Sequence, residues 1–290
     1  MAAAPVCSVV IPVYNGAATI GEQLAALADQ TYTEPFEVVV ADNGSTDDLG
    51  AVLDAWRDRL PLLRRVDASR ARGVSVARNE GVRAAATDRI LVCDADDVVD
   101  RDWVRALATA LDDHAFVGAA HETESLSGRS AAWVPVDSPS TGLPVTWEGR
   151  PYALGGNCAF RREVFDDAGG YDEDFPPGAE EIDFAWRAFD AGHVAVYVPE
   201  AVLHYRIRTD LRGVLRQQYD SGRGTATVAA RVRPAGLVPK SLARRVHHEL
   251  LLVRRFPWRG SADDRRSWLV LMAFEAGKLV EARRLGVPAP

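Results

Sequence analysis

The chain has 290 residues, enough for one large domain or for a domain with a sizeable appendage, and 47% of them are hydrophobic, as in a globular protein with a substantial core. Its formal net charge of −7 conceals an asymmetry: residues 1–200 hold 34 acidic and 16 basic side chains, whereas residues 201–290 hold 7 and 18. No apolar run approaches the roughly 18 residues that a membrane span needs, so we expect no membrane-spanning helix. The basic third lacks the interleaved aromatic residues of a nucleic-acid binder, so we expect no nucleic-acid partner.

The first residues and the cysteines indicate the compartment. MAAAPVCSVVIP lacks a basic region and a cleavage site ahead of its first strand, so we expect no signal peptide. Cys7, Cys93 and Cys158 stand apart, without the CxxC spacing of a metal site. Because their number is odd and two lie in apolar runs, we expect buried free thiols in a reducing cytosol.

The first 120 residues alternate strands with helices. The strands are near-continuous apolar runs, a pattern that predicts a parallel sheet with helices on both faces. Ligands bind such sheets beyond the carboxyl ends of the strands. Strands are predicted at 7–14, 36–42, 62–68 and 89–97, and helices at 17–29, 46–59 and 73–86.

Two of these strands end in polar residues, and the third predicted helix carries a further candidate binding residue. Pro12, Tyr14 and Asn15 come at the end of the first; because Pro12 has no N–H to donate to a central ladder, we expect the backbone to leave the sheet there. Asp42 ends the second strand and could accept a hydrogen bond from a base or a ribose. Arg78, in SVARNEG, could pair with a phosphate or a base carbonyl through its planar fork.

The strand RILVCDADD ends in the most informative of these tips. Asp94, Asp96 and Asp97 repel one another unless a cation neutralises them. Mg²⁺ prefers oxygen ligands and commonly bridges carboxylates to substrate phosphates, so this tip predicts a metal–diphosphate site. The alternative is an exposed acidic turn that caps the next helix.

The middle of the chain is less regular. Residues 121–156 are rich in Ser, Thr, Gly and Pro and are predicted as a long loop with at most a short strand, a common form for a lid or binding element. Trp133 and Trp147 either form part of an acceptor site or anchor this loop to the core. Helices follow at 161–168 and 180–191, and an extended segment at 193–205.

The last third is predicted to be helical. Leu242, Val246, Leu250 and Val253 recur at helical spacing in a basic helix at 239–257, which lies on an anionic membrane or packs on the catalytic domain or a dimer partner. Ser261 and Asp264 form a capping box for a final helix to about Arg284.

In this order and spacing, IPVYN, VVVADNGSTDD, SVARNEG and ILVCDADD resemble the motifs of family 2 glycosyltransferases of the GT-A fold. GGNCAFRREVFDDAGGYDEDF and GAEEIDFAWRAFDAG resemble the acceptor-side motifs of that family, so the resemblance covers roughly residues 6–210. It implies a Rossmann-like, mostly parallel sheet with helices on both faces in a catalytic domain at 1–207. The nucleotide-sugar half would be about 1–120, the acceptor half about 121–207, and 208–290 a basic helical C-terminal extension.

The resemblance also implies the residues that bind the donor. Asp42 would contact the base, usually uracil, and Gly156, with Gly155, would form the floor of the sugar site. Asp96 and His204 would bind Mn²⁺ or Mg²⁺, although a histidine at a strand end can also be structural. The full set of implied donor-binding positions is Pro12, Tyr14, Asn15, Asp42, Arg78, Asp94, Ala95, Asp96 and Gly156.

The implied reaction is single displacement at the anomeric carbon with inversion. Glu181 aligns with the usual catalytic Asp and would be the general base, with Glu180 and Asp183 as open alternatives. Asp183 and Arg187 are read as a structural or acceptor-positioning pair.

The implied partners are a nucleotide sugar, with UDP expected, and an acceptor that is a natural product, a peptide, or a lipid-linked or cell-envelope glycan. A cytoplasmic enzyme at the inner face of the membrane and a homodimer are both compatible with the sequence. A non-catalytic nucleotide-sugar or acceptor-binding module is one alternative function. A haloacid-dehalogenase-type phosphatase is a weaker one, because the only lysines, Lys240 and Lys278, lie in the helical tail.

Overall fold

The protein is described from a computed structural model, which describes residues 4–127, 133–134, 141–146, 149–232 and 254–289. Its contacts divide the chain into two compact units. The first, the sheet unit, comprises residues 1–126, 137–173 and 181–206. The second, the helical unit, comprises residues 127–136, 174–180 and 207–290. The helical unit therefore includes two short segments from the middle of the chain, and the domain boundary after residue 207 stays a prediction.

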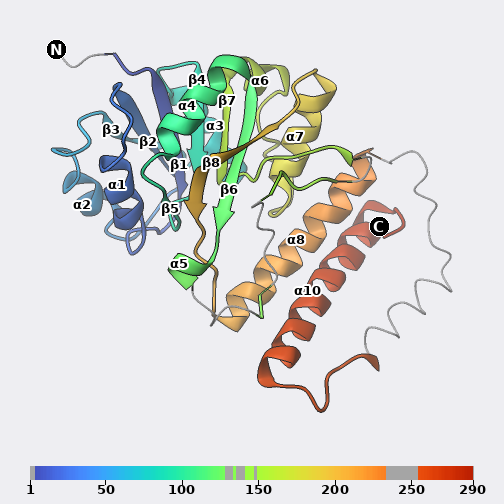
Figure 1. Cartoon of the computed structure of the whole chain (residues 1–290). Coiled ribbons are helices and arrows are strands. Elements are labelled where there is room, and N and C mark those ends of the chain that lie inside the picture. Colours follow the sequence, from blue (N-terminus) through green and yellow to red (C-terminus); the bar gives the residue numbers. More distant parts are fainter. Residues whose placement is uncertain (1–3, 128–132, 135–140, 147–148, 233–253, 290) are drawn as a thin grey trace. The chain divides into compact units, whose positions relative to one another are not determined.

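An eight-stranded sheet forms the centre of the sheet unit, with the strand order β3-β2-β1-β4-β7-β6-β8-β5 (Figure 1). The pairs β1–β2, β2–β3, β1–β4 and β6–β8 are parallel, whereas β7 is antiparallel to both of its neighbours and β5 is antiparallel to β8. The strands are β1 (Cys7–Val13), β2 (Phe36–Asp42), β3 (Leu63–Asp67), β4 (Arg89–Cys93), β5 (Val98–Val99), β6 (Phe116–Glu122), β7 (Asn157–Arg161) and β8 (Val196–His204).

Helices cover both faces of this sheet. Alternate side chains of a strand point to opposite faces, so Val9 and Ile11 join the apolar cluster that contains residues of α1 and α4, whereas Val10 joins the cluster of α3 and α7. The predicted arrangement of helices on both faces is confirmed. The helices are α1 (Ile20–Ala28), α2 (Leu49–Asp54), α3 (Val74–Ala84), α4 (Trp103–Asp113), α5 (Glu124–Ser127), α6 (Arg162–Asp167) and α7 (Glu180–Asp190).

The prediction that the chain leaves the sheet at Pro12 is wrong on one side of the strand. β1 stays paired with β2 up to Val13, and Pro12 lies opposite Ala41. On its other side β1 pairs with β4 only up to Val10, two residues before the proline. Pro12 lacks a ladder donor, and β1 and β4 are not paired with each other beyond Val10 and Val92.

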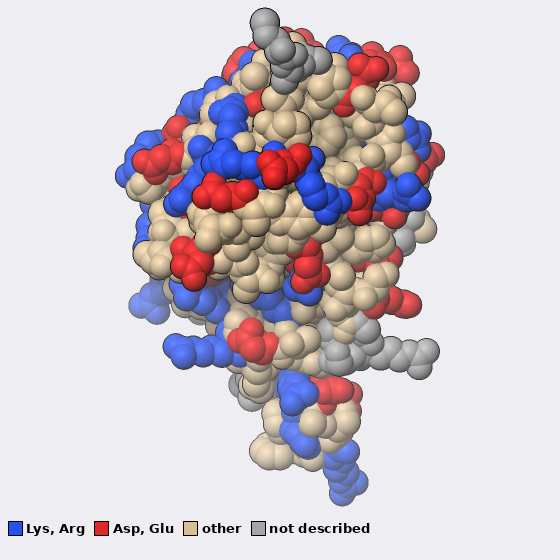
Figure 2. Space-filling model, turned by 90° about the vertical axis from the view of Figure 1, so that its left-hand side faces the viewer, with Lys and Arg blue, Asp and Glu red and all other residues tan. Residues whose placement is uncertain are grey.

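The surface beside α1, α2 and β3 intersperses basic and acidic side chains (Figure 2). Two ion pairs belong to this region, Arg57–Asp54 at 2.8 Å and Arg59–Asp29 at 2.7 Å. Both pairs are more than half exposed, and exposed pairs of this kind contribute little to stability.

Two long helices, α8 (Leu211–Val232) and α10 (Ala262–Leu285), form the body of the helical unit and run side by side in the same direction (Figure 1). Their backbones approach closely at two glycines. A Cβ atom on Gly222 would lie 2.1 Å from the carbonyl oxygen of Phe274, and one on Gly277 would lie 2.0 Å from that of Tyr219. Glycine is the residue that allows such close backbone approach.

The ends of α10 agree with the prediction. Ser261 and Asp264 form the capping box, and Gly286 ends the helix in the left-handed conformation with φ 67°. The predicted helix at 239–257 lies outside the described residues over 233–253. No described helix is both long enough and apolar enough to cross a membrane.

Candidate active site

The acidic tip after β4 lies at the carboxyl edge of the sheet. Asp97 is buried, and its Oδ1 accepts a hydrogen bond from the Arg206 backbone N–H at 2.8 Å. Burial, together with the charges of Asp94 and Asp96, raises the pKa of Asp97 to about 8. Asp94 and Asp96 are partly exposed. Of the three carboxylates, these two are therefore the ones that a ligand can reach.

The backbone of this tip is fixed by side chains from elsewhere. Gln23, which is fully buried, donates from Nε2 to the carbonyl of Asp94 at 3.2 Å and accepts from the N–H of Val99 at 2.9 Å. Arg206 donates from Nε to the carbonyl of Asp96 at 2.8 Å. Ala95, between the two carboxylates, is buried in the apolar cluster beside α1. The carboxylates therefore project from a rigid turn.

Arg78 lies directly against this tip. Its guanidinium is buried and donates to Asp94 Oδ1 at 3.4 Å. The turn before β7 packs so closely on both residues that it has no space for side chains at its two glycines. A Cβ on Gly155 would lie 2.8 Å from the Arg78 guanidinium, and one on Gly156 would lie 2.2 Å from Asp94 Oδ2. The structure thus brings together Arg78, Asp94 and Gly156, which the sequence placed in three separate motifs.

The loops after β1 and β2 are tied to each other. Asn15, at φ 52°, accepts from the N–H of Thr46 at 2.8 Å through Oδ1, and its own N–H donates to Ser45 Oγ at 2.9 Å. Tyr14 is 46% exposed, with the Arg72 guanidinium 4.2 Å from its ring centroid. An exposed aromatic ring next to an arginine is suited to a planar or anionic ligand.

Asp42 is buried at the end of β2. It accepts from the Ser45 N–H at 2.8 Å and forms an ion pair with Arg65. Burial raises the pKa of Asp42, but the hydrogen bonds from Ser45 and Arg65 outweigh it and hold the pKa below the usual value. Asp42 is therefore ionised at neutral pH, and its contact with a base stays a prediction.

Asn43 organises the neighbouring loop and was not singled out from the sequence. Its Nδ2 donates to the carbonyls of Ala68 at 2.6 Å and Ala71 at 2.8 Å, and its Oδ1 accepts from the Gly73 N–H at 2.9 Å. This asparagine therefore ties the end of β2 to the start of α3, which carries Arg78. Its place directly after Asp42 was the only signal in the sequence.

His204 reaches the edge of the site through the pairing of β8 with β5, in which it lies opposite Val98. Its Nδ1 lies 2.8 Å from Glu122 Oε2, and its Nε2 lies 3.8 Å from Asp100 Oδ2. A carboxylate at one ring nitrogen is the arrangement that orients metal-binding histidines and leaves the other nitrogen for the ion. Its role as a metal ligand stays a prediction.

His121 is a second histidine near the tip, and it is not among the residues predicted from the sequence. It is buried and stacks on Tyr205, with ring centroids 5.5 Å apart. Burial lowers its pKa to about 4, although the charge of Asp94 acts in the opposite direction. His121 is therefore neutral at pH 7, and its motif HETE gave no signal of its burial.

The start of α7 holds three carboxylates in different environments. Asp183 is buried and accepts from Arg187 Nε at 2.9 Å, and Arg187 also donates to the carbonyl of Gly170 at 2.6 Å. Glu180 is buried and accepts from the Gly178 N–H at 2.9 Å. Glu181 is half-buried. Asp183 and Glu180 are thus engaged in local structure, and the Asp183–Arg187 pair holds the turn after α6.

The carboxylates at the acidic tip would hold a divalent cation only together with oxygen ligands from a substrate. In the part of the chain that the structure describes, no group of three or more His, Cys, Asp or Glu side chains is arranged to hold a metal ion. Carboxylates from a single turn suit a hard cation that takes its remaining oxygens from phosphates. The residues present therefore fit a metal bound together with a diphosphate.

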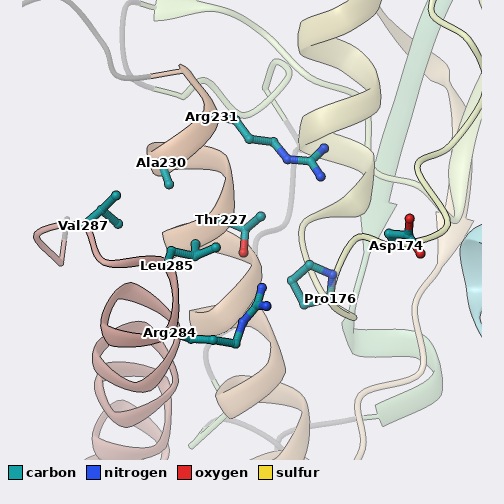
Figure 3. Close-up of a pocket in the computed structure, with 8 residues that line it drawn as sticks. All are labelled: Asp174, Pro176, Thr227, Ala230, Arg231, Arg284, Leu285 and Val287. Carbon is teal, nitrogen blue, oxygen red and sulfur yellow. The ribbon is translucent and has the colours of Figure 1, made fainter.

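The helical unit contains a separate pocket of roughly 300 Å³ (Figure 3). Arg231 and Arg284 contribute positive charge, and Thr227 contributes a hydroxyl. The remaining lining residues are Asp174, Pro176, Ala230, Leu285 and Val287. Two arginines beside apolar side chains suit an anionic group with an apolar neighbour.

Trp133 lies in the helical unit and lines neither the acidic tip nor the pocket with Arg231 and Arg284. It is 5% exposed and packs in a small apolar cluster with Val214 of α8 and Val270 of α10. It therefore anchors its segment, the second of the two roles expected for it. Trp147 lies outside the described residues.

Comparison with known proteins decides the family. The family described as "Glycosyl transferase family 2" matches residues 8–169, which run from β1 to just beyond α6. The chain belongs to this family. The match includes the acidic tip and Arg78, but it ends before α7.

Individual relatives are consistent with this. Chondroitin synthase of Pasteurella multocida is 26% identical over 221 residues, which cover 64% of this chain and 23% of that protein. The chain spans about a quarter of the length of the curated relatives that it matches first.

Solved structures have the same fold. The mannosyltransferase PcManGT of Pyrobaculum calidifontis, in complex with GDP-Man and Mn²⁺, has a TM-score of 0.61 and 24% identity, over 97% of this chain and 75% of that one. TarS 1–349 of S. aureus, in complex with UDP-GlcNAc, has a TM-score of 0.59 and 18% identity, over 97% and 92% of the two chains. These are GT-A glycosyltransferases, and the predicted fold class is confirmed.

Proposed function

We propose that this chain transfers a sugar from a nucleotide diphosphate to an acceptor, with inversion at the anomeric carbon. The observation that carries the proposal is the contact of Arg78 with Asp94 at the carboxyl edge of the sheet, with Gly155 and Gly156 closing over both. A cationic guanidinium and accessible carboxylates at a strand end suit a metal-bound diphosphate.

The metal site would consist of Asp96 and, at its edge, His204. Glu122 orients the His204 ring at 2.8 Å, and Gln23 and Arg206 fix the backbone beneath Asp96. Bound Mn²⁺ or Mg²⁺ would offset the negative charge that develops on the leaving diphosphate. Arg78 would bind the same diphosphate from the side of α3.

Glu181 would be the general base. Glu181 is half-buried at the start of α7, at the position that aligns with the usual catalytic Asp of the family, and a carboxylate there suits removal of a proton from the acceptor. One displacement from the face opposite the diphosphate inverts the anomeric centre, and no covalent sugar–enzyme intermediate is required.

The donor is proposed to be a UDP-sugar. The structure of TarS in complex with UDP-GlcNAc supports uridine, and that of PcManGT with GDP-Man and Mn²⁺ leaves guanosine as the alternative. Asp42, buried but ionised, would accept a hydrogen bond from the base, and Tyr14 would lie along its edge.

The acceptor is proposed to be an anionic cell-envelope or lipid-linked glycan handled on the cytoplasmic side. TarS of Staphylococcus aureus is named a poly(ribitol-phosphate) beta-N-acetylglucosaminyltransferase, which is a precedent in the family for an acceptor that carries phosphate. The pocket with Arg231 and Arg284 would suit such a group (Figure 3). A natural product or a peptide is the alternative acceptor.

The test is turnover of nucleotide sugars with Mn²⁺ or Mg²⁺, measured as release of the nucleoside diphosphate without an acceptor. We expect Asp96→Asn to lower this turnover at least 100-fold, because the diphosphate loses its metal. Asp88→Asn, at a side chain that is 89% exposed, is the matched control and should not change it.

A second variant tests the base. Glu181→Gln should bind UDP as tightly as the unchanged protein in calorimetry while transfer to an identified acceptor falls at least 100-fold. Full transfer by this variant would exclude Glu181. Binding of UDP without turnover of any donor would instead support a non-catalytic binding module.

A further inference from the structure

The helix α10 has an inner face against α8 and an outer face that no described element covers. The inner face carries the buried residues Val270, Gly277, Glu281 and Ala282. On the outer face, Leu269, Leu279 and Val280 are 37%, 38% and 51% exposed. With Met272 and Ala276 they recur at spacings of three and four residues, which aligns them in one apolar stripe along the helix.

Arginines lie at both ends of this stripe. Arg265 and Arg266 lie in the first turns, and Arg283 and Arg284 lie in the last, all of them exposed. Two of them are paired with carboxylates of the same helix. Glu275 and Glu281 are buried and paired with Lys278 and with Arg223 and Arg284.

The acidic residues at the start of the helix are also engaged locally. Asp264 belongs to the capping box with Ser261, and Asp263 pairs with Arg266 at 3.0 Å. These aspartates balance the two arginines of the first turns, but residues 254–289 together hold eight basic and four acidic side chains, so the segment as a whole is positively charged.

An aromatic group adjoins the start of this face. Trp258 is 82% exposed, and its ring packs edge-on against Phe256, with centroids 4.7 Å apart. Phe256 in turn packs against Trp268 of α10. An exposed tryptophan of this kind is costly in water but favourable at the boundary between lipid head groups and acyl chains.

We propose that the outer face of α10, together with Trp258, docks onto the surface of an anionic lipid bilayer. The helix would lie in the plane of the membrane with its apolar stripe inserted into the head-group boundary. Its exposed arginines would contact lipid phosphates.

Charge favours this partner over a second copy of the chain. Two copies would each bring eight basic and four acidic side chains of residues 254–289 to the contact, so their net charges would repel. An anionic bilayer attracts the same surface.

The test is co-sedimentation of the full chain with vesicles of 70% phosphatidylcholine and 30% phosphatidylglycerol. We expect binding that weakens at least tenfold between 0.1 and 0.5 M salt, because exposed charges are screened. Binding should also be absent with pure phosphatidylcholine. The double variant Leu279→Glu/Val280→Glu should lose at least tenfold in affinity. The matched control is Val145→Glu/Val194→Glu, which alters two exposed valines of the sheet unit and should bind like the unchanged protein.

Three outcomes would overturn the proposal. One is equal binding of both double variants, and another is binding of neither variant nor the unchanged protein. The third is self-association without lipid, seen in sedimentation equilibrium and lost in Leu279→Glu/Val280→Glu, which would assign the face to a second copy. Donor turnover without acceptor should be the same in all variants, so failure here is distinct from failure of the proposed function.

Discussion

At the scale of single residues, the site depends on a glycine, which has no side chain, as much as on the charged residues. Gly156 allows Asp94 to lie against the turn before β7, where a Cβ would overlap its carboxylate at 2.2 Å. Arg78 limits the movement of Asp94 from the other side. The sequence predicted that Asp94 and Gly156 act at the donor site, but it could not show that they touch, because their contact joins two strands far apart in the chain.

We predict that Gly156→Ala damages activity more than stability. The atoms in its way belong to a side chain that can rotate, so the free energy of unfolding should change by less than about 1 kcal/mol. The displaced Asp94 should lower donor turnover at least tenfold. Gly142→Ala is the control, because a Cβ there meets nothing within 4 Å. Equal activity of the two variants in the diphosphate-release measurement would contradict the prediction.

At the scale of elements, one carboxylate holds the parallel half of the sheet together. Glu37 of β2 accepts from Ser8 Oγ on β1 at 2.5 Å, from the Ala86 N–H at 2.5 Å and from Arg64 Nε on β3 at 2.9 Å. Burial raises the pKa of Glu37, but these hydrogen bonds outweigh it and the pKa lies below the usual value. An ionised carboxylate is therefore part of the native sheet.

We predict that Glu37→Gln lowers the free energy of unfolding by about 2 kcal/mol at pH 7, the range for hydrogen bonds to a charged group. Because the pKa of Glu37 is lower in the folded state, its ionised carboxylate stabilises the fold at every pH above the unfolded-state value of 4.5. This stabilisation is lost as the pH falls through the folded-state pKa. The difference between variant and unchanged protein in urea unfolding should therefore shrink below about pH 4. Glu34→Gln, at an exposed residue, should show neither effect.

The elements that the sequence predicted are those with long apolar runs or clear caps. β1, β2 and β4 were predicted within a few residues, and Ser261 and Asp264 gave the start of α10. β7 was missed, because NCAFR is too short to show a period and runs directly into α6. The pairing of β1 past Pro12 was also mispredicted. A proline lacks the N–H that would bond to one neighbouring strand, but the strand can stay paired on its other side.

At the scale of the whole molecule, the chain consists of two units of different construction. The sheet unit has apolar clusters on both faces of a sheet, whereas the helical unit relies on the close approach of α8 and α10. The composition of residues 201–290 showed an excess of basic side chains but not the close approach of the two helices. The contact of Trp133 with Val214 and Val270 could not be predicted either, since it joins a loop to helices far along the chain.

We predict that Gly277→Ala destabilises the helical unit by about 2 kcal/mol or more, because its Cβ would overlap a backbone carbonyl that cannot rotate away. Hydrogen exchange should become faster for amides of α8 and α10, and unchanged for β1 and β2. Gly213→Ala is the control, because the atoms nearest its Cβ belong to the Asp210 carboxylate, which can rotate away. Faster exchange throughout the sheet would show that the two units unfold as one.

The antiparallel pairing of β6 with β7 has a consequence for how such proteins diversify. Because the two strands are neighbours, the chain departs after Glu122 and returns at Asn157 on one rim, where Cys93 also pairs with Asn157. The intervening stretch can thus be exchanged, shortened or extended as a cassette without altering any strand. Grafting that cassette between homologues, with Gly155 and Gly156 kept in place, should retune what is glycosylated and leave the choice of activated sugar intact.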